Sequence, residues 1–442
     1  MAGLCAARVL APRFSEVVVL DRDDLPDSPG PRSRVPQDRH PHLLLHAGAT
    51  ILQEWFPGLI EELQDAGAVD IDLCADFVWY QSGGVQRRPA TSLRGPAMSR
   101  PLLEQTVRRR VEQLPQVTIR AGATATGVTL DETGARVTGV LLEGGTQLPA
   151  DLVIDASGRQ ARTLRWLEGL GYGPPEVSVV EVNTSYVSRR FRRTPDKTRD
   201  WKAAAVVGDP ETCRLTMALP MEDDQWIVMI GGVNGEAPPT DEVGMLAYAR
   251  SFDCSLIADL MRDCVPTGPV VTHHFPTNQR RHVEKLRRFP LGWLPLGDAV
   301  CSFDPIYGQG MTSAALQACA LADCLDGAAD LDRTFSRSYF KAVARVVAAP
   351  WSIAVGGDFV YPGTKGKKPF GTDFFNRYTE KVVRAGQRDD IVVERFNEVI
   401  SLVQPPESLF SPPFVVRVLT GARRVRRTRR REARQGVAGS TG

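Results

Sequence analysis

The stretch that decides the fold runs Leu291-Gly-Trp-Leu-Pro-Leu-Gly-Asp298, and Phe303-Asp-Pro-Ile-Tyr-Gly-Gln-Gly-Met311 follows it closely. The apolar residues at its start predict a short strand buried in a parallel sheet. An acid at the end of such a strand, here Asp298, can accept hydrogen bonds from the hydroxyl groups of a ligand. An ordinary loop between a strand and a helix is the alternative, but the string is long and specific.

Gly308 and Gly310 flank a turn that opens a predicted helix over residues 310–325. The first N–H groups of a helix have no partner within the helix, and together with the helix dipole they favour negative charge. This turn therefore suits an electron-rich ring edge, such as the pyrimidine edge of a reduced flavin. The residues assigned to a cofactor site from these two segments are Gly297, Asp298, Pro305, Gly308, Gly310 and Met311.

The first 21 residues fit the second half of a dinucleotide-binding unit. Residues 1–10 are small and apolar, as in a helix, and residues 16–20 predict a buried parallel strand. Gly3 and Asp21 stand 18 residues apart, close to the spacing between the last glycine of such a unit and its ribose-binding acid. The first strand and the first two glycines of the unit are missing from this sequence. We expect either a start codon further upstream or a truncation that weakens nucleotide binding.

A third segment, Asp155-Ala-Ser-Gly158, follows a predicted strand over residues 152–155. A sharp turn at this point would run beneath a cofactor. Asx turns after strands are common, so this turn alone is weak evidence for a cofactor site. Asp155 and Gly158 are assigned to the site because their segment lies between the other two segments along the chain. The three segments together predict one FAD site.

An inserted, sheet-rich region separates these segments. Several strands recur between residues 175 and 280, with one helix predicted over 241–261. We predict an α/β protein: a glutathione-reductase-like FAD-binding Rossmann fold with an inserted, mainly antiparallel β-sheet substrate domain and C-terminal helices. The predicted ranges are FAD-binding residues 1–74, 96–174 and 283–340, substrate-domain residues 75–95 and 175–282, C-terminal helices 341–420, and a basic disordered tail 421–442.

Residues 1 to about 330 resemble the group A FAD-dependent monooxygenases, such as para-hydroxybenzoate hydroxylase and squalene epoxidase. The three segments match that family's second dinucleotide strand, its middle motif and its Gly-Asp motif. Arg34-Val-Pro-Gln-Asp-Arg-His-Pro-His42 and the stretch 303–311 are similar to segments of actinobacterial FAD-dependent epoxidases, including those that epoxidise the polyene precursors of polyether antibiotics such as lasalocid. The resemblance continues through Tyr361-Pro-Gly363 into the C-terminal helices.

The resemblance also implies residue roles. Asp21 and Arg22 would lie at the adenosine end of FAD, and Arg100 near its diphosphate or ribityl part. Asp298 would bind the ribityl and phosphate groups, while Gly308, Gly310 and Met311 would line the pyrimidine edge. The residues expected near the mobile flavin loop are Gln37, Arg39, His40 and His42.

The implied activity is a monooxygenation. NADPH or NADH would reduce FAD, and O₂ would supply one oxygen atom to epoxidise or hydroxylate a small hydrophobic molecule of secondary metabolism. No side chain need act as an acid or base, so we name no catalytic residue. The middle motif lacks the Asp-Gly pair associated with nicotinamide binding in aromatic hydroxylases, which leaves the choice of reductant open. The alternatives are a flavin-dependent reductase of isoprenoid double bonds and a degenerate, non-catalytic scaffold. The Trp-x-Trp-x-Ile-Pro motif of flavin halogenases is absent.

Charge and cysteine content limit the partners. The chain has 54 Lys and Arg against 52 Asp and Glu, so its overall balance does not imply nucleic acid. Eight arginines lie between Arg423 and Arg434, and we interpret them as a solvated tail or as a weak contact with anionic surfaces. The eight cysteines show no CxxC spacing, and neither a signal peptide nor a membrane span is predicted. We therefore expect a cytoplasmic protein.

Other candidate residues have less specific patterns. His40, His42 and His46 lack metal-ligand spacing and a partnering carboxylate, so no metal site is predicted. Trp226 is a candidate for the substrate pocket, although large aromatics more often belong to the core. The pairs Arg280-Arg281 and Arg287-Arg288 could bind phosphates, but we expect them on a solvated basic face.

Overall fold

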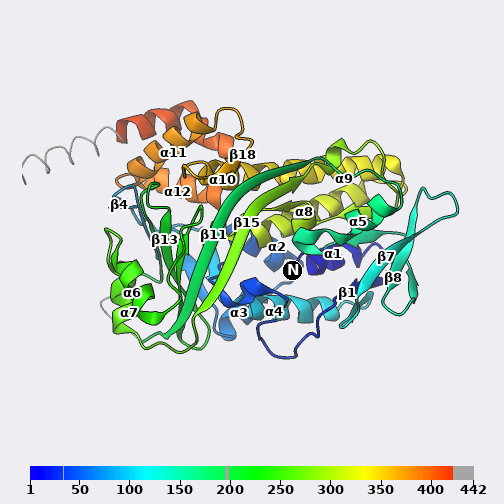
Figure 1. The fold of residues 1–442 in the computed structure, drawn as a ribbon, viewed down its shortest axis with the longest axis horizontal. Helices are drawn as coiled ribbons and strands as arrows, with labels where there is room; N and C mark the ends of the chain where they lie inside the picture. The colour runs from blue at the N-terminus through cyan, green and yellow to red at the C-terminus, as the bar shows by residue number, and fades with distance from the viewer. Residues whose placement is uncertain (33, 195–198, 422–442) are drawn as a thin grey trace, which may run out of the picture.

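A nine-stranded, mainly antiparallel sheet runs through the middle of the protein in the computed structural model, which describes residues 1–32, 34–194 and 199–421 (Figure 1). Strand β11, Val177–Arg192, pairs with β14 on one side and with β15 on the other. On β14, Trp226 packs in a core that includes residues of α6 and α7. Met229, three positions along the strand and therefore on the opposite face, packs in a different core cluster. The sheet therefore has two distinct faces, and α6 and α7 cover one of them.

Two separate pairs of parallel strands lie beyond this sheet. Strand β1, Val17–Leu20, pairs with β6, Val117–Arg120, and β10, Val153–Asp155, pairs with β16, Trp293–Pro295. No strand of the described chain joins the two pairs.

Helix α8, Gly310–Asp326, is the central helix of this half of the protein. Helices α1, α2 and α9 pack against it. Gly48 of α2 lies so close to α8 that an added Cβ would come 2.5 Å from Thr312 Oγ1. A larger residue at position 48 would therefore push the two helices apart.

The remaining elements complete these layers, with the C-terminal helices α10, α11 and α12 at one end of the molecule (Figure 1). The other helices are α1 Ala2–Leu10, α2 His46–Trp55, α3 Leu59–Asp65, α4 Arg100–Glu112, α5 Arg162–Gly169, α6 Glu242–Arg250, α7 Leu256–Asp263, α9 Arg333–Val346, α10 Ala348–Asp358, α11 Thr372–Gly386 and α12 Asp390–Ile400. The other strands are β2 Val69–Asp72, β3 Phe77–Gln81, β4 Gly84–Val85, β5 Arg94–Ala97, β7 Ala125–Leu130, β8 Val137–Leu142, β9 Gln147–Pro149, β12 Ala203–Val207, β13 Arg214–Met221, β14 Gln225–Gly232, β15 Val271–Arg281, β17 Cys301–Ser302 and β18 Lys365–Gly366.

Two stretches of the sequence with helical spacing of apolar residues, 43–66 and 241–261, are each divided in the structure. The helical pattern over residues 43–66 forms α2 and α3, which are separated at Gly58, where φ is +83°. The single helix expected over 241–261 forms α6 and α7, because a short irregular segment that includes Ser255 interrupts it. In both cases the helical spacing of apolar residues continues across the point where the helix is interrupted, so the spacing alone does not reveal the interruption.

Some sequence expectations concern the whole chain. In the described ranges, no helix combines the length and apolar character that a membrane crossing requires. All eight cysteines are free thiols. The arginines from Arg423 to Arg434 lie outside the described residues.

Candidate functional site

Asp298 lies directly after strand β16, in a tight turn. Gly297 has a φ of +71°, in the left-handed region that favours glycine. A Cβ at this position would also come 2.7 Å from Ala2 Cβ, so glycine lets α1 begin beside the turn. The Gly297 N–H donates to Gln317 Oε1 at 2.8 Å, which ties the turn to α8. Local backbone requirements thus hold Asp298 near the start of α1.

Positively charged groups surround Asp298. Burial raises the pKa of the Asp298 carboxyl. The nearby charges that oppose this rise belong to Arg100, Arg159, the Met1 amine and Arg281. The Arg281 guanidinium donates to the carbonyl oxygen of Arg159 at 2.7 Å. Three guanidinium groups, those of Arg100, Arg159 and Arg281, therefore lie near Asp298, although Arg100 also pairs with Asp38, and such groups can attract an anionic ligand.

Arg281 was expected on a solvated basic face, and this expectation was wrong. It is only partly exposed, and its guanidinium is occupied by carbonyl oxygens beside Asp298. Arg287 and Arg288 are exposed, as expected. Strand β15 ends at Arg281, and pairing with β17 brings this end of the strand next to the Gly297–Ala299 turn. Only the tertiary fold makes this contact.

Arg100 owes its position to the start of α4. The Ser99 side chain accepts the N–H of Leu102 at 3.2 Å, and Pro101 occupies the first turn. A serine at the N-cap and a proline in the first turn are local sequence signals for the start of a helix. The Ser99 N–H donates to Glu222 Oε2 at 2.8 Å, so the turn between β13 and β14 also fixes the cap.

A chain of charged groups links Arg100 to the end of β1. Arg100 forms an ion pair with Asp38, whose side chain is 3% exposed. Asp38 also accepts the backbone N–H of Arg32 at 3.0 Å, and the Arg32 guanidinium pairs with Asp21 at 3.0 Å. The predicted residues Asp21 and Arg100 are therefore connected through Arg32 and Asp38. Sequence reasoning missed these two, although both lie in the charged loop that follows Asp21.

The first turn of α8 is open. Gly308 has a φ of +67°, and no heavy atom lies within 4 Å of a Cβ built on Gly308 or on Gly310. Gln309 stands at the N-cap without capping the helix through its side chain, and its Oε1 is buried without a partner among the described residues. Gly308 and Gly310 are therefore exposed, and the Gln309 side chain does not cap the first N–H groups of α8.

The turn after β10 lies beside the start of α1. Asp155 Oδ1 accepts the backbone N–H and the hydroxyl of Ser157, at 3.0 and 2.6 Å. Asp155 Oδ2 is buried and has no partner among the described residues. Gly158 has a φ of +79°, and a Cβ on Gly3 would lie 3.7 Å from that of Ala156. Gly3, Asp155 and Gly158 are therefore neighbours, and Asp155 keeps one acceptor free.

The other predicted residues lie around this centre with fewer contacts. Arg22 and Arg39 are exposed, and Gln37 is partly buried in the short turn Pro36–Arg39. Pro305 opens the turn that ends at Gly308. His42 Nδ1 lies 2.8 Å from the carbonyl oxygen of His40. Among the described residues, none of these side chains forms a hydrogen bond or an ion pair with Asp298.

A cluster of aromatic rings lies where the charged loop meets the sheet. His40 Nδ1 lies 2.8 Å from Ser188 Oγ, and burial lowers the pKa of His40 to about 3. The ring of Tyr186 stacks on His273 at 5.9 Å, and the His40 ring lies 5.6 Å from that of His273. Among the described residues, no three His, Cys, Asp or Glu side chains gather as metal ligands. Burial lowers the pKa of His273 as well as that of His40, so both rings favour the neutral form.

Two fully buried aspartates connect this cluster to the turn before α8. Tyr186 and Thr184 donate their hydroxyls to Asp304, and Asp304 Oδ1 also accepts the N–H of Ile306 at 3.1 Å. Burial raises the pKa of Asp304. Asn278 bridges to the second aspartate, since its Oδ1 accepts the N–H of Asp304 at 2.6 Å.

The second aspartate is Asp358, at the end of α10. Asn278 Nδ2 donates to it at 2.5 Å, and the Tyr307 hydroxyl donates to it at 2.8 Å. Burial and the neighbouring charge of Asp304 raise the pKa of Asp358. Asp304 and Tyr307 belong to the stretch 303–311, so that stretch is fixed from behind by the sheet and by α10.

Trp226 lies away from this cluster. It is 2% exposed on β14 and packs against Trp201, with the two ring centroids 5.6 Å apart. Its core cluster includes residues of α6 and α7, whereas Tyr186 belongs to the cluster on the other face of the sheet. The structure therefore does not bring Trp226 together with the other candidate site residues.

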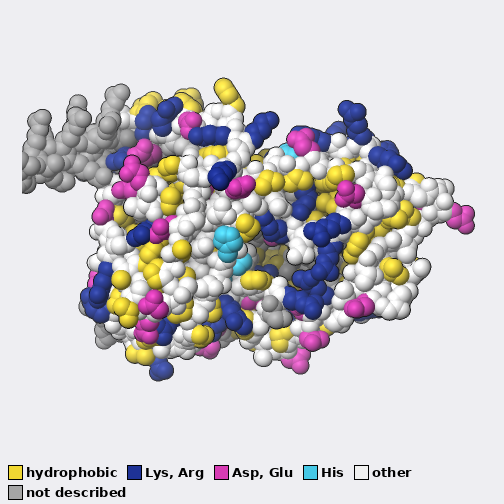
Figure 2. Space-filling view, in the orientation of Figure 1, with side chains coloured by type: hydrophobic (Ala, Val, Ile, Leu, Met, Phe, Trp, Pro, Cys, Tyr) yellow, Lys and Arg dark blue, Asp and Glu magenta, His cyan; other side chains and the backbone are white. Residues whose placement is uncertain are grey.

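A hollow opens in the middle of one face of the molecule (Figure 2). Lys and Arg side chains crowd one side of it, and histidine side chains lie at the opposite side (Figure 2).

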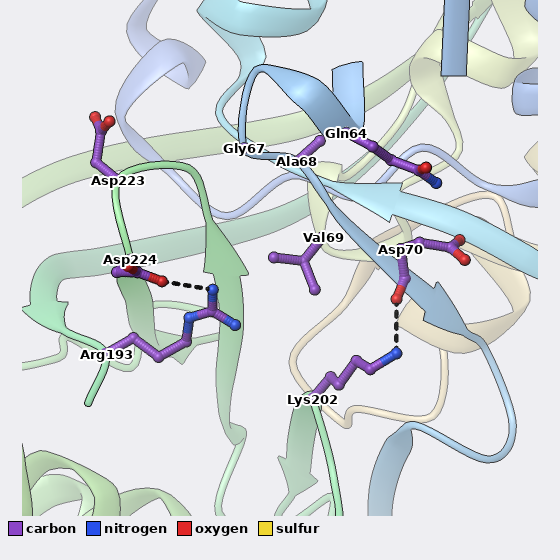
Figure 3. A pocket seen from close by; sticks show the side chains of 9 residues that line it. All are labelled: Gln64, Gly67, Ala68, Val69, Asp70, Arg193, Lys202, Asp223 and Asp224. Atoms are coloured by element: carbon purple, nitrogen blue, oxygen red, sulfur yellow. Dashed lines mark hydrogen bonds and ion pairs between the residues drawn. The ribbon is translucent and has the colours of Figure 1, made fainter. Parts of the chain in front are cut away.

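A different cavity, of about 530 Å³, lies between β2 and the turn that joins β13 to β14 (Figure 3). Its charged groups other than Asp223 have partners among the described residues. Arg193 pairs with Asp224 at 3.0 Å, and Lys202 Nζ donates to the carbonyl oxygen of Asp70 at 3.0 Å. None of the predicted site residues lines it. The candidate site is therefore not this cavity but the group of residues around Asp298.

Comparisons with known proteins agree with this architecture. No protein-family model matches the chain. Protein Rv3254 of Mycobacterium tuberculosis is 33% identical over 465 residues, which cover 99% of this chain and 95% of that protein.

Solved structures share the fold at low sequence identity. The flavin-dependent brominase Bmp2 has a TM-score of 0.66 at 12% identity, over 98% of this chain and 96% of its own. PqsL of Pseudomonas aeruginosa, a probable FAD-dependent monooxygenase, has a TM-score of 0.59 at 19% identity, over 89% and 96%. The p-nitrophenol 4-monooxygenase PnpA of Pseudomonas putida has a TM-score of 0.60 at 17% identity, over 90% and 95%. The predicted fold class is thus confirmed.

Proposed function

The chain belongs to the same family as Protein Rv3254 of Mycobacterium tuberculosis. Because it also has the fold of FAD-dependent monooxygenases, we propose that it binds FAD and catalyses a monooxygenation. In this proposal NADPH or NADH is the reductant, and a small hydrophobic molecule is epoxidised or hydroxylated. The observation that carries the proposal is the position of Asp298, among Arg100, Arg159 and Arg281.

The residues present fit FAD on three structural grounds. The open space over Gly308 and Gly310 would admit a flat ring against the uncapped start of α8. Buried Asp155 Oδ2 and Gln309 Oε1 lack partners among the described residues, and hydroxyl groups of a ligand would satisfy them. The cationic groups around Asp298 would neutralise a diphosphate.

Each part of the site would hold a different part of the cofactor. Asp21 would bind the ribose of the adenosine end, with Arg22 beside it. Arg100 would bind the diphosphate and Asp298 the ribityl chain, and Gly308, Gly310 and Met311 would line the pyrimidine edge. Gly3 and Gly158 would let the cofactor approach the backbone, Asp155 would accept a hydrogen bond from it, and Gly297 would keep Asp298 in position. The loop with Gln37, Arg39, His40 and His42 would cover the flavin.

Bound FAD would supply the oxygen-transfer chemistry, and the protein would supply position and shielding. The buried pair Asp304 and Asp358 would fix the turn Pro305–Tyr307 against the sheet. The neutral rings of His40, His273 and Tyr186 would form an apolar wall with few exposed charges, which suits a hydrophobic substrate.

The absorption spectrum of the purified protein tests the cofactor assignment. We expect the two visible flavin bands in protein produced with any in-frame upstream codons, after addition of FAD. Flavin bands in the present sequence as well would show that the fold binds FAD without a strand between its two parallel pairs. If neither form binds added FAD, the assignment is wrong and the scaffold alternative is favoured.

Oxygen consumption tests the reaction class. A monooxygenase consumes O₂ and NADPH or NADH in a substrate-dependent manner, whereas a reductase of isoprenoid double bonds consumes the reductant alone. We expect uptake of O₂ to rise on addition of polyene or aromatic substrates. Substrate reduction under anaerobic conditions would favour the reductase.

A further inference from the structure

A group of exposed phenylalanines follows α10. The side chain of Phe370 is fully exposed, at 105%, and those of Phe374 and Phe375 are 59% and 49% exposed. The Phe410 ring lies 5.1 Å from Phe375 and 6.5 Å from Phe374. We call Phe370, Phe374, Phe375 and Phe410 the phenylalanine patch. The rings of Phe374, Phe375 and the partly exposed Phe410 lie together, and Phe370 precedes them in the adjoining loop. An exposed apolar group of this kind can mark an interaction site.

Positive charge surrounds the phenylalanine patch. Lys365, Lys367, Arg377 and Lys381 are exposed, and no described residue pairs with any of the four. The acids closest to them in sequence are already neutralised: Asp373 pairs with Lys368, and Glu380 pairs with Arg384. Glu176, which lies near Lys367, pairs with Lys285. The surroundings of the patch therefore carry a net positive charge.

The segments that carry the patch are anchored to the body of the protein. Strand β18, Lys365–Gly366, pairs with β11, and Thr364 Oγ1 donates to the carbonyl oxygen of Asp358 at 2.6 Å. Helix α11 is held by the Tyr378 hydroxyl, which donates to the carbonyl oxygen of Leu409 at 2.6 Å. Apolar side chains protrude from the edge of the molecule in this region, next to Lys and Arg side chains (Figure 2).

We propose that the phenylalanine patch docks this protein on an anionic lipid bilayer. Aromatic side chains insert at the boundary between headgroups and acyl chains, while lysine ammonium groups remain at the level of anionic headgroups. A protein partner fits less well, because lysine is depleted at the centre of protein interfaces and Phe370 projects from a loop instead of lining a groove. This proposal is independent of the cofactor assignment.

Co-sedimentation with vesicles tests the proposal on the full chain. We expect binding to vesicles of phosphatidylcholine mixed with phosphatidylglycerol, weaker binding at high salt, and little binding to pure phosphatidylcholine. The double variant Phe370→Asp/Phe374→Asp should bind the mixed vesicles at least about tenfold more weakly. Replacing Lys367 and Lys381 by Gln should weaken binding about fivefold for each lysine.

Matched variants serve as controls. Val243→Asp places the same charge on an exposed apolar residue of α6, 78% exposed, and Lys341→Gln neutralises an exposed lysine of α9. Both controls should bind like the unmodified protein. Because all these positions are exposed, thermal unfolding should stay cooperative in every variant.

Three results would overturn the proposal. The first is a protein that does not bind the mixed vesicles. The second is binding that survives the phenylalanine variant unchanged, which would assign the contact to another surface. The third is a dimer in solution that Phe370→Asp dissociates, without vesicle binding, which would make the patch a contact between copies of the chain.

Discussion

Asp298 is the residue on which the cofactor assignment depends. Its replacement in Asp298→Asn keeps the shape of the side chain but removes the charge that the neighbouring arginines face. A hydrogen bond to a charged group contributes about 1.5–3 kcal/mol, so we expect FAD affinity to fall about 10- to 100-fold. Titration of the flavin absorbance or fluorescence measures this loss.

The matched control is Asp209→Asn, at an exposed position far from the candidate site residues in sequence and contact. It should bind FAD with unchanged affinity. Equal affinity in Asp298→Asn and the unmodified protein would remove Asp298 from the cofactor site.

His40 makes stability depend on pH. Burial lowers its pKa to about 3 in the folded protein, while an unfolded chain protonates histidine below about 6.5. The unfolded state therefore binds more protons between these values, and stability is lost as the pH falls from about 6.5 towards 3. Chemical denaturation at about pH 7 and about pH 5 should show a loss of about 1–2 kcal/mol that the His40→Asn variant lacks.

The buried aspartates act in the opposite direction. The raised pKa values of Asp304 and Asp358 contribute stability that is fully present below about 4 and is lost as the pH rises through the folded values. The comparison must therefore be made between the variant and the unmodified protein at each pH. An equally steep dependence in His40→Asn would assign the acid sensitivity to other groups.

Individual residues were predictable from sequence where the backbone itself imposes a requirement. The left-handed conformation at Gly297 and Gly308 and the cap at Ser99 are local, and their sequence signals are local as well. The contact between Tyr186 and Asp304 joins residues 118 positions apart. No pattern in the sequence carries such a contact, because only the packing of β11 against the turn before α8 creates it.

Among the elements, the contact between α2 and α8 allows a sharp test. In Gly48→Ala the new Cβ would lie 2.5 Å from Thr312 Oγ1 and 3.2 Å from Thr312 Cα, so the helices must separate. We expect a loss of about 1–3 kcal/mol in the free energy of unfolding, measured by denaturant titration.

Gly169→Ala is the corresponding control. Gly169 also lies in a helix, α5, but nothing lies within 4 Å of its added Cβ. This variant should be neutral or more stable by up to about 1 kcal/mol, since alanine has the higher helix propensity. A similar destabilisation in both variants would mean that glycine is required for reasons other than the helix contact.

The length of β11 was harder to predict than its existence. The apolar run over residues 177–182 predicts a strand, and the structure extends it to Arg192. A bulge between Glu181 and Thr184, with Asn183 at φ +42°, shifts the register there. Alternation is therefore interrupted inside one continuous strand, and a search for period-two patterns ends too early.

At the scale of the whole molecule, no strand of the described residues joins the two parallel strand pairs. A ligand that contacts both β1 and the turn after β16 would join them. Saturating FAD, at about 100 times its dissociation constant, should therefore raise the free energy of unfolding by about 2.7 kcal/mol. Thermal unfolding with and without FAD measures this.

Riboflavin provides the contrast, because it lacks the diphosphate and the adenosine. It should stabilise the protein much less than FAD. An equal shift with both ligands would mean that the cationic groups around Asp298 do not contact the diphosphate.

The overall arrangement was predictable because three separated segments follow one order along the chain. The strands, turns and helices at residues 17–21, 153–158 and 293–311 each carry a local signal. The hydrogen bond by which Asp358 holds the stretch 303–311 was not predictable, because α10 comes next to this stretch only in the folded chain.

Only a short segment separates Asp358, which binds Tyr307 beside the candidate flavin site, from Phe370 of the phenylalanine patch. The patch and the site are thus linked through α10 and the segment that follows it, and a docked bilayer would supply a lipid-soluble substrate to the protein from the membrane instead of from bulk water. Turnover would then follow surface-dilution kinetics: the rate would depend on the mole fraction of substrate in the lipid phase, and adding inert lipid at constant total substrate would slow the enzyme.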